Sequence, residues 1–363
     1  MNAYTWMMAI VVGLSLLMRG NKKGSKAFIF FAVIAMFCIM GFRESTLIGV
    51  DSASSYLHGY QKITAMDWGT FREEYDGFNV GFFYLMKIVS DLSNGNYQTF
   101  IIVISAFIML CFGHFIKRYS VSPVQSVCYY WGLLQYIFMF SAEKQAIAMA
   151  FLLLAFDAII DKKPIKFIIL VLIASQFHFP ALVFLPAYWI SKMKANNGYL
   201  ILLAIVLATT YVFRDAILKF MLDAYGGDDI GVTMKGITFL RNKVLIMIVI
   251  VVAALILRSP TEDDYVYSIL LKFMGVAIVF QTFCGYNNIF ERLADYYFQF
   301  AVVFIPLVFE KNSKVQCKLD AGFANPIKSF APVVFCGFGI WRFAGYIKAC
   351  GSLFLPYVFY FNK

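Results

Sequence analysis

Charged residues are scarce in this chain of 363 residues: 14% are Asp, Glu, Lys or Arg, against about 25% in soluble domains. Apolar residues make up 61% of the chain and aromatic residues 18%. This composition excludes an ordinary soluble enzyme, a disordered protein and a nucleic-acid binder, and it predicts a polytopic membrane protein. The formal net charge of +10 therefore bears on membrane orientation rather than on a nucleic-acid partner.

The chain also lacks the sequence patterns of metal sites and of nucleotide binding. Its seven cysteines form no CxxC pair, and its three histidines do not cluster with them. A disulfide framework and a zinc site are therefore not predicted. A Gly-rich phosphate-binding loop is also missing from the sequence. We expect no cofactor and no resident metal, although Asp51 stays open as a metal ligand.

Apolar runs near the roughly 20 residues that cross a bilayer occur along the whole chain. The first run lacks a basic n-region and a small-residue cleavage site, and it is expected to be a retained span rather than a signal peptide. An all-α bundle of about twelve spans is predicted, forming a single integral membrane domain over 1–363. The runs lie at 3–18, 27–42, 97–116, 122–140, 145–160, 165–178, 180–192, 198–213, 243–258, 265–284, 292–309 and 329–347, with soft boundaries near Pro180 and Pro186.

The segment 78–92 decides the orientation of the later runs. It is apolar but carries Lys87 and Asp91. If it does not cross, the outer loops are 43–95 and 214–242, and sixteen basic residues fall in short cytoplasmic loops, as the positive-inside rule favours. We therefore predict that 78–92 is interfacial or re-entrant; the alternative, a true span that inverts everything after it, stays open. The sixteen are Arg19, Lys22, Lys23, Lys26, Lys117, Arg118, Lys162, Lys163, Lys166, Lys192, Lys194, Arg258, Lys311, Lys314, Lys318 and Lys328.

Ionisable residues at the rims of the apolar runs are the candidates for function, because such groups are costly in a membrane. Under the preferred topology, several of them gather at the outer boundary. Cations there suit a diphosphate or another anionic headgroup, and a neutral His with carboxylates can take a proton from a sugar hydroxyl. We predict group transfer on a lipid-linked phosphorylated substrate. The residues are Arg43, Asp51, Glu143, Lys144, His178, Glu291 and Arg292.

Structural explanations for these residues stay open beside the functional one. Arg43 can be a residue at the end of a span that snorkels to the interface. Asp51 can cap a helix that begins in the segment after it. Arg292 can pair with Glu291 or Asp295 as a packing ion pair.

Four segments, in this order along the chain, resemble the EpsG-type family of Wzy-like polysaccharide polymerases. They are GFRESTLIGVDSASSY at 41–56, SAEKQAIAMAFLLLAF at 141–156, KFIILVLIASQFHFPALVFLPAY at 166–188 and ERLADYYFQFAVVFIP at 291–306, with LPYVFYF at 355–361 in the same style. The chain departs from the family pattern at three positions. Lys144 replaces a usual Arg and loses its bidentate fork, Pro180 replaces a Ser, and Asn79 replaces an acidic residue.

The resemblance implies a GT-C-like enzyme in the bacterial cytoplasmic membrane, with its active site facing outside. The enzyme would join oligosaccharide repeat units carried on undecaprenyl diphosphate, which serve as both donor and acceptor. A growing chain would be cut from its diphosphate and moved to a hydroxyl of the next unit. Membrane lipids, a flippase and a chain-length regulator are the other partners implied.

The resemblance and the chemistry together imply a role for each candidate. The diphosphate would be bound by Arg43, Lys144 and Arg292. The catalytic residues would be His178 or Asp51 as base and Glu291 as the residue that orients a cation. Gln145, Tyr56 and Tyr296 would support the site, although Tyr296 and Tyr297 taken by themselves are expected in the aromatic belt at the interface.

Other functions stay open from the sequence. A transporter or flippase for the same lipid-linked sugars would need polar groups through the midplane, where Lys272 is the main candidate. A glycan ligase shares the diphosphate chemistry and differs in its acceptor, and a membrane acyltransferase is a related alternative. A non-enzymatic assembly partner is the last alternative.

Overall fold

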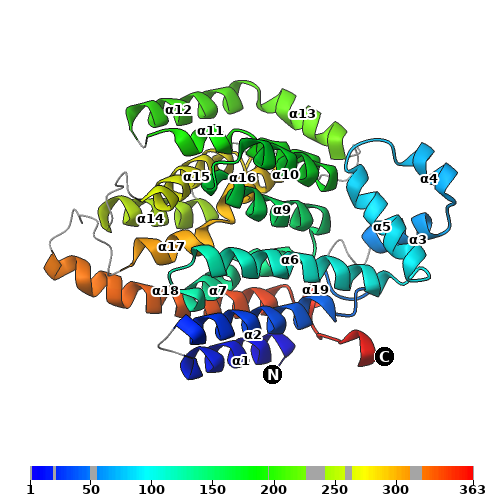
Figure 1. Ribbon diagram of the computed structural model, residues 1–363, viewed down its shortest axis with the longest axis horizontal. Coiled ribbons are helices and arrows are strands. Elements are labelled where there is room, and N and C mark those ends of the chain that lie inside the picture. The colour runs from blue at the N-terminus through cyan, green and yellow to red at the C-terminus, as the bar shows by residue number, and fades with distance from the viewer. Residues whose placement is uncertain are drawn as a thin grey trace. The chain divides into compact units, whose positions relative to one another are not determined.

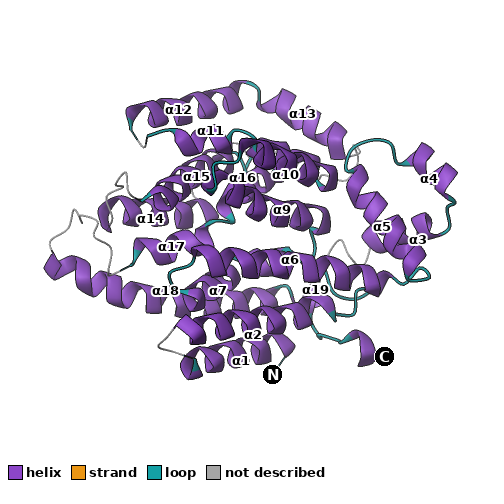
Figure 2. Ribbon diagram, viewed as in Figure 1, coloured by secondary structure: helices purple, strands orange, loops and turns teal. Residues whose placement is uncertain are grey.

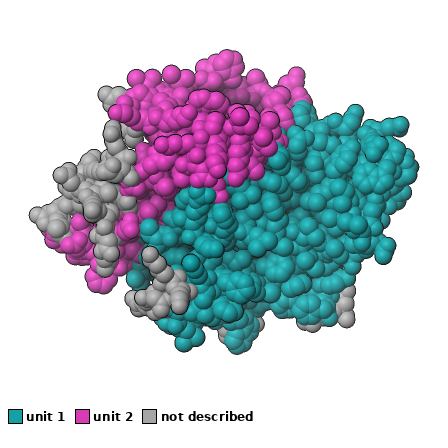
Figure 3. Space-filling model, in the orientation of Figure 1, with its two compact units in different colours: residues 1–154, 173–178, 333–363 teal, residues 155–172, 179–332 magenta. Residues whose placement is uncertain are grey.

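The computed structural model describes residues 2–18, 22–49, 55–194, 196–225, 242–257, 264–310 and 321–362. Over these ranges the chain is helical and has no β-strand, apart from an isolated antiparallel bridge between Arg43 and Phe359 (Figure 2). The chain divides into two compact units (Figure 3). Unit 1 comprises 1–154, 173–178 and 333–363, and unit 2 comprises 155–172 and 179–332.

Unit 1 is built around α2, which packs against α1 on one side and α6 on the other (Figure 1). Helices α7 and α18 approach each other so closely that a Cβ added to Gly132 would lie 2.4 Å from the Cα of Gly339. Small residues at such a crossing let two backbones approach inside a membrane. The helices are α1 (Ala3–Leu17), α2 (Lys22–Gly41), α3 (Leu57–Thr64), α4 (Trp68–Glu74), α5 (Val80–Leu92), α6 (Tyr97–Tyr119), α7 (Pro123–Gly132), α8 (Gln135–Phe138), α19 (Gly351–Phe354) and η3 (Tyr360–Asn362).

The predicted outer segment 43–95 contains α3, α4 and α5, of which α3 and α5 pack on each other. Asp67 begins α4 by accepting a hydrogen bond from the backbone N–H of Gly69 at 2.7 Å. The 13 residues of α5 make a helix about 20 Å long, shorter than the roughly 30 Å hydrocarbon core. Lys87 on this helix donates to the carbonyl of Met66 at 2.7 Å and pairs with Asp91 at 2.8 Å.

Unit 2 is built around α15, which is buried along most of its length and contacts α11, α12, α14, α16 and α17. Its Lys272 donates to the carbonyl oxygens of Ser191 and Met193 at 2.8 and 2.6 Å, so it satisfies backbone groups at the end of α11. The helices are η2 (Phe179–Phe184), α11 (Ala187–Lys192), α12 (Asn197–Val212), α13 (Arg214–Tyr225), α14 (Asn242–Leu257), α15 (Tyr265–Thr282), α16 (Asn288–Phe298) and α17 (Ala301–Val308), while α9 (Glu143–Ile160), α10 (Pro164–Phe177) and α18 (Ala321–Ala349) have residues in both units.

Four helices of the described chain are long and apolar enough to cross a membrane, and a bent pair, α12 with α13, makes a fifth. The twelve predicted spans are therefore not confirmed as a count. Besides 180–192, two predicted runs are broken in the structure: 122–140 divides into α7 and α8 at Leu134, whose φ is 62°, and 292–309 divides into α16 and α17. The predicted softness near Pro180 and Pro186 is confirmed, because 3₁₀-helix η2 and the short α11 lie there.

Candidate functional site

Arg43 and Glu143 form a fully buried ion pair in unit 1, with Nη2 and Oε1 3.6 Å apart. Arg43 follows the end of α2, and Glu143 is the first residue of α9. The guanidinium also donates to the carbonyl oxygens of Met40 and Phe140 and lies 4.9 Å from the centre of the Phe140 ring. The pair therefore joins the end of α2 to the turn before α9, two segments about a hundred residues apart in the chain.

Tyr97, the first residue of α6, completes this buried group. Its hydroxyl lies 3.1 and 3.3 Å from the two carboxylate oxygens of Glu143 and donates to them. Asn96 fixes the start of α6 by accepting from the N–H of Gln98 at 2.9 Å. Glu143 thus has a cation on one side and a hydroxyl donor on the other, which a buried carboxylate requires.

Lys144, the next residue after Glu143, is half-buried against aromatic rings. Its ammonium nitrogen lies 4.4 Å from the ring centre of Phe83, 5.4 Å from that of Phe82 and 5.9 Å from that of Tyr56. Such rings attract a cation through their negative faces. Lys144 precedes the apolar run at 145–160, and burial lowers the pKa of its ammonium to about 8.

The first turn of α5 also contacts the end of α10, which directly precedes His178. A Cβ added at Gly81 would lie 2.8 Å from the Cβ of Gln176, so only glycine lets α5 approach the end of α10 this closely. His178 follows that helix end and is buried. Because Phe82 and Phe83 hold Lys144 and Gly81 contacts Gln176, the start of α5 brings Lys144 and the end of α10 into one region of unit 1.

Most of the predicted site residues in unit 1 therefore gather around the starts of α5, α6 and α9. Gln145 is also buried there, on the first turn of α9. Asp51, predicted as a base or a helix cap, lies outside the described residues. The cluster of Arg43, Tyr56, Phe82, Phe83, Tyr97, Glu143 and Lys144 is called the α9 cluster below.

A second charged group lies in unit 2 on α16. Lys243, at the start of α14, pairs with Glu291 at 3.3 Å and also with Asp295. Glu291 and Asp295 are four residues apart and share one face of α16. Glu291 therefore pairs with Lys243 in the structure, and its role in orienting a cation of the active site stays a prediction.

Arg292 and Tyr296 lie on the same helix as Glu291. Arg292 is half-buried, and Tyr296 is fully buried. Tyr297 is buried as well, and its hydroxyl donates to the carbonyl of Val183 at 2.8 Å. The expectation that Tyr296 and Tyr297 belong to an interfacial aromatic belt is wrong, because both rings pack inside unit 2.

A family model for the EpsG family matches residues 26–359, which is most of the chain. The chain belongs to the EpsG family. This is a family of Wzy-like polymerases, and membership indicates a membrane glycosyltransferase of the polysaccharide-polymerase type. The resemblance stated from the four sequence segments is thereby confirmed. No curated protein and no solved structure matches the chain significantly.

The EpsG match includes both charged groups, and two of their polar residues, Lys243 and Tyr97, were not singled out from the sequence. Asp295 was named from the sequence only as a possible partner of Arg292, and its spacing of four residues after Glu291 places both carboxylates on one helix face. Lys243 carried a weak signal, as a cation at the start of an apolar run. Tyr97 carried none, because a tyrosine at a helix start is ordinary in a chain with 22 tyrosines.

The described part of this EpsG protein contains no group of three His, Cys, Asp or Glu side chains placed to hold a metal ion. The chemistry that its residues offer is that of fixed cations, a hydroxyl, carboxylates and an imidazole. Such groups can hold a phosphate, stabilise charge on a leaving group and accept a proton.

Proposed function

We propose that this EpsG protein polymerises undecaprenyl-diphosphate-linked oligosaccharide repeat units on the outer face of the cytoplasmic membrane. The observation that carries the proposal is the α9 cluster, in which Lys144 is held by rings beside the Arg43–Glu143 pair in a chain of the EpsG family. A lysine that is held against aromatic rings at the rim of an apolar run is costly as a core residue and suits an anionic headgroup.

The proposed reaction is a transfer of the growing chain. The acceptor hydroxyl oxygen attacks C1 of the sugar attached to the donor diphosphate, and a new C–O glycosidic bond forms. The bond between C1 and the phosphate oxygen breaks, and its electron pair leaves with the undecaprenyl diphosphate. The hydroxyl proton passes to a base on the protein, so that atoms and charge balance.

Each charged residue has a proposed part in this step. Lys144 contacts the diphosphate and stabilises the charge that develops on it. Arg292 keeps the diphosphate-binding role that the sequence predicts for it. His178 accepts the hydroxyl proton, with Asp51 as the alternative base. Arg43 is held by Glu143, and it reaches the diphosphate directly only when that carboxylate releases it.

The test is a gel of purified protein incubated with lipid-diphosphate-linked repeat units from its own host. We expect a ladder spaced by one repeat unit, formed by protein in detergent without two compartments. A single transfer to a foreign acceptor would indicate a ligase instead. Well-folded protein that converts none of the native substrate would contradict the proposal and favour the transporter.

The pH dependence of polymerisation provides a test of Lys144. Because the pKa of Lys144 is lowered to about 8, the ammonium is charged below that pH and neutral above it. We expect kcat/KM, which reports the free enzyme, to fall as the pH rises through about 8. Lys144→Arg should remove this alkaline decline, since an arginine stays charged. The matched control is Lys87→Arg, which should keep the alkaline decline. If Lys144→Arg keeps the decline as well, Lys144 is not the group that causes it.

A further inference from the structure

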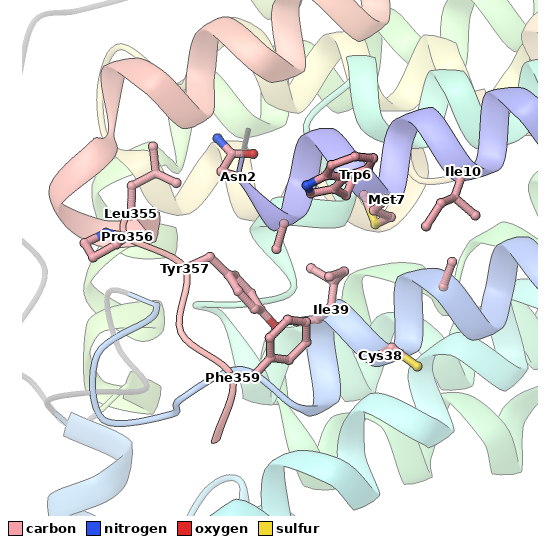
Figure 4. Close-up of a pocket in the computed structure, with 12 residues that line it drawn as sticks. Asn2, Trp6, Met7, Ile10, Cys38, Ile39, Leu355, Pro356, Tyr357 and Phe359 are labelled. Atoms are coloured by element: carbon pink, nitrogen blue, oxygen red, sulfur yellow. The ribbon is translucent and has the colours of Figure 1, made fainter. Parts of the chain in front are cut away.

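A groove of about 1080 Å³ lies in unit 1 between α1, α2 and the C-terminal segment 355–359. Figure 4 shows Tyr357 and Phe359 of this segment beside α2, with Trp6 and Ile10 along α1. The lining residues on α1 include Ala3, Trp6, Met7 and Ile10, which recur at helical spacing and form one face of the helix. That face is about 10 Å long.

Two of the polar groups that line the groove are already engaged within the protein. The side-chain oxygen of Asn2 accepts hydrogen bonds from the backbone N–H and the hydroxyl of Thr5 at 2.9 and 2.8 Å. The hydroxyl of Tyr357 donates to the carbonyl of Ile39 at 2.7 Å. What the lining presents to an occupant is aliphatic and aromatic carbon, so the groove suits a hydrocarbon rather than a polar ligand.

The helices that flank the groove indicate that this hydrocarbon is the chain of a lipid. Helix α2 is one of the helices long and apolar enough to cross a membrane, and α1 is a shorter apolar helix. Trp6 and Ile10 are 57% and 53% exposed, so the α1 side of the groove is open along its length. A chain can therefore enter sideways from a bilayer.

One wall of the groove contacts the α9 cluster. Phe359 forms the antiparallel bridge with Arg43, and the N–H of Glu44 donates to the carbonyl of Val358 at 2.9 Å. The ring of Tyr357 lies 5.2 Å from that of Tyr4. The same segment that forms a wall of the groove thus fixes the backbone at Arg43.

Contacts between aromatic rings also connect the groove wall to the Arg43–Glu143 ion pair. The ring of Tyr4 lies 6.1 Å from that of Phe140, and the Arg43 guanidinium lies over Phe140. The buried hydroxyl of Tyr4 has no hydrogen-bond partner among the residues that the structure describes. An apolar groove whose wall contacts a buried arginine, with an unsatisfied hydroxyl nearby, matches a ligand with a hydrocarbon chain and an anionic head.

We propose that this groove binds the polyprenyl chain of the lipid-linked substrate and directs its diphosphate towards the α9 cluster. The proposal rests on the proposed function for the identity of the lipid. The acyl chain of a bilayer phospholipid is also a hydrocarbon that the groove could hold. A phospholipid, however, carries no diphosphate for Lys144 to bind.

The test uses undecaprenyl diphosphate that carries a diazirine on the isoprene unit next to the diphosphate, added to the full-length protein in nanodiscs. After irradiation, we expect mass spectrometry to find the label in residues 2–10, 35–39 or 355–359. Unlabelled undecaprenyl diphosphate should compete at least tenfold better than phosphatidylglycerol. Equal competition would identify an ordinary bilayer lipid, and label confined to other segments would overturn the proposal.

Tryptophan substitutions that fill the groove, and one that does not, provide the matched variants. Ala35→Trp on α2 should reduce cross-linking at least tenfold, and Ala3→Trp on α1 gives a second test if the first variant does not fold. Ala9→Trp, which is on α1 but does not line the groove, should leave it unchanged. Cross-linking does not depend on turnover, so the two proposals can fail separately. Label in the groove without a polymer ladder would contradict the polymerase function and leave the groove proposal standing. A ladder without label in the groove would contradict only the proposal that the groove binds the polyprenyl chain.

Discussion

Arg43→Ala should lower the free energy of unfolding by about 3–5 kcal/mol, because it leaves a buried carboxylate without its cation. Glu143 would retain the hydroxyl of Tyr97 but lose the guanidinium at 3.6 Å. Glu143→Gln should cost less, since a neutral amide still accepts from Tyr97. Thermal unfolding of the purified protein in detergent measures both effects.

An apolar replacement of the whole group separates stability from activity. The triple variant Arg43→Met, Glu143→Leu and Tyr97→Phe should recover most of the stability lost in Arg43→Ala, because well-packed apolar residues often replace a buried ion pair without cost. We expect it to fold and yet to form no ladder, since the α9 cluster has lost the groups beside Lys144. If the triple variant forms ladders at the normal rate, the Arg43–Glu143 pair contributes to stability and not to polymerisation.

Arg292→Ala should lower the rate of polymerisation by about 10²–10³-fold, which is the cost of removing one well-aimed donor to a developing anion. Arg292→Lys should recover part of the rate, because it restores the charge without the bidentate fork. The amount of protein inserted in the membrane should not change, since the residue is half-buried. Ladder gels at matched protein levels provide the measurement.

Arg214 is the matched control for Arg292. It lies in the same unit, is partly exposed and packs over the rings of Tyr211 and Tyr286. Arg214→Ala removes a guanidinium of the same size from a position that we place outside the diphosphate site. If the two alanine variants slow polymerisation equally, or if Arg292→Ala forms ladders of normal length and rate, Arg292 does not bind the diphosphate.

The positions of most long helices follow from the sequence within a few residues. Helices α1, α6, α10, α12, α14 and α15 coincide closely with the apolar runs, because hydrophobicity over a long window marks a membrane helix. The breaks were harder to predict. Leu134 has a positive φ although it is not a glycine, and the break between α16 and α17 lies inside an apolar run.

The candidate site residues could likewise be identified from the sequence, but their interaction partners could not. Ionisable side chains are conspicuous in an apolar chain, so Arg43, Glu143, Lys144 and Glu291 stand out. Their partners do not. Tyr97 and Lys243 carry no distinctive signal, and the rings around Lys144 are a few among many aromatic residues.

The sequence by itself determined the helical membrane class, the family and the identity of the charged candidates, because composition, apolar run length and local motifs are properties of neighbouring residues. Only the tertiary structure decided that Arg43 is enclosed by Glu143, that Tyr56 and Phe83 hold Lys144 and that the C-terminal segment forms a wall of a groove with α1 and α2. Membrane helices are apolar on most faces, so their periodicity does not show which faces meet, and close packing makes that choice.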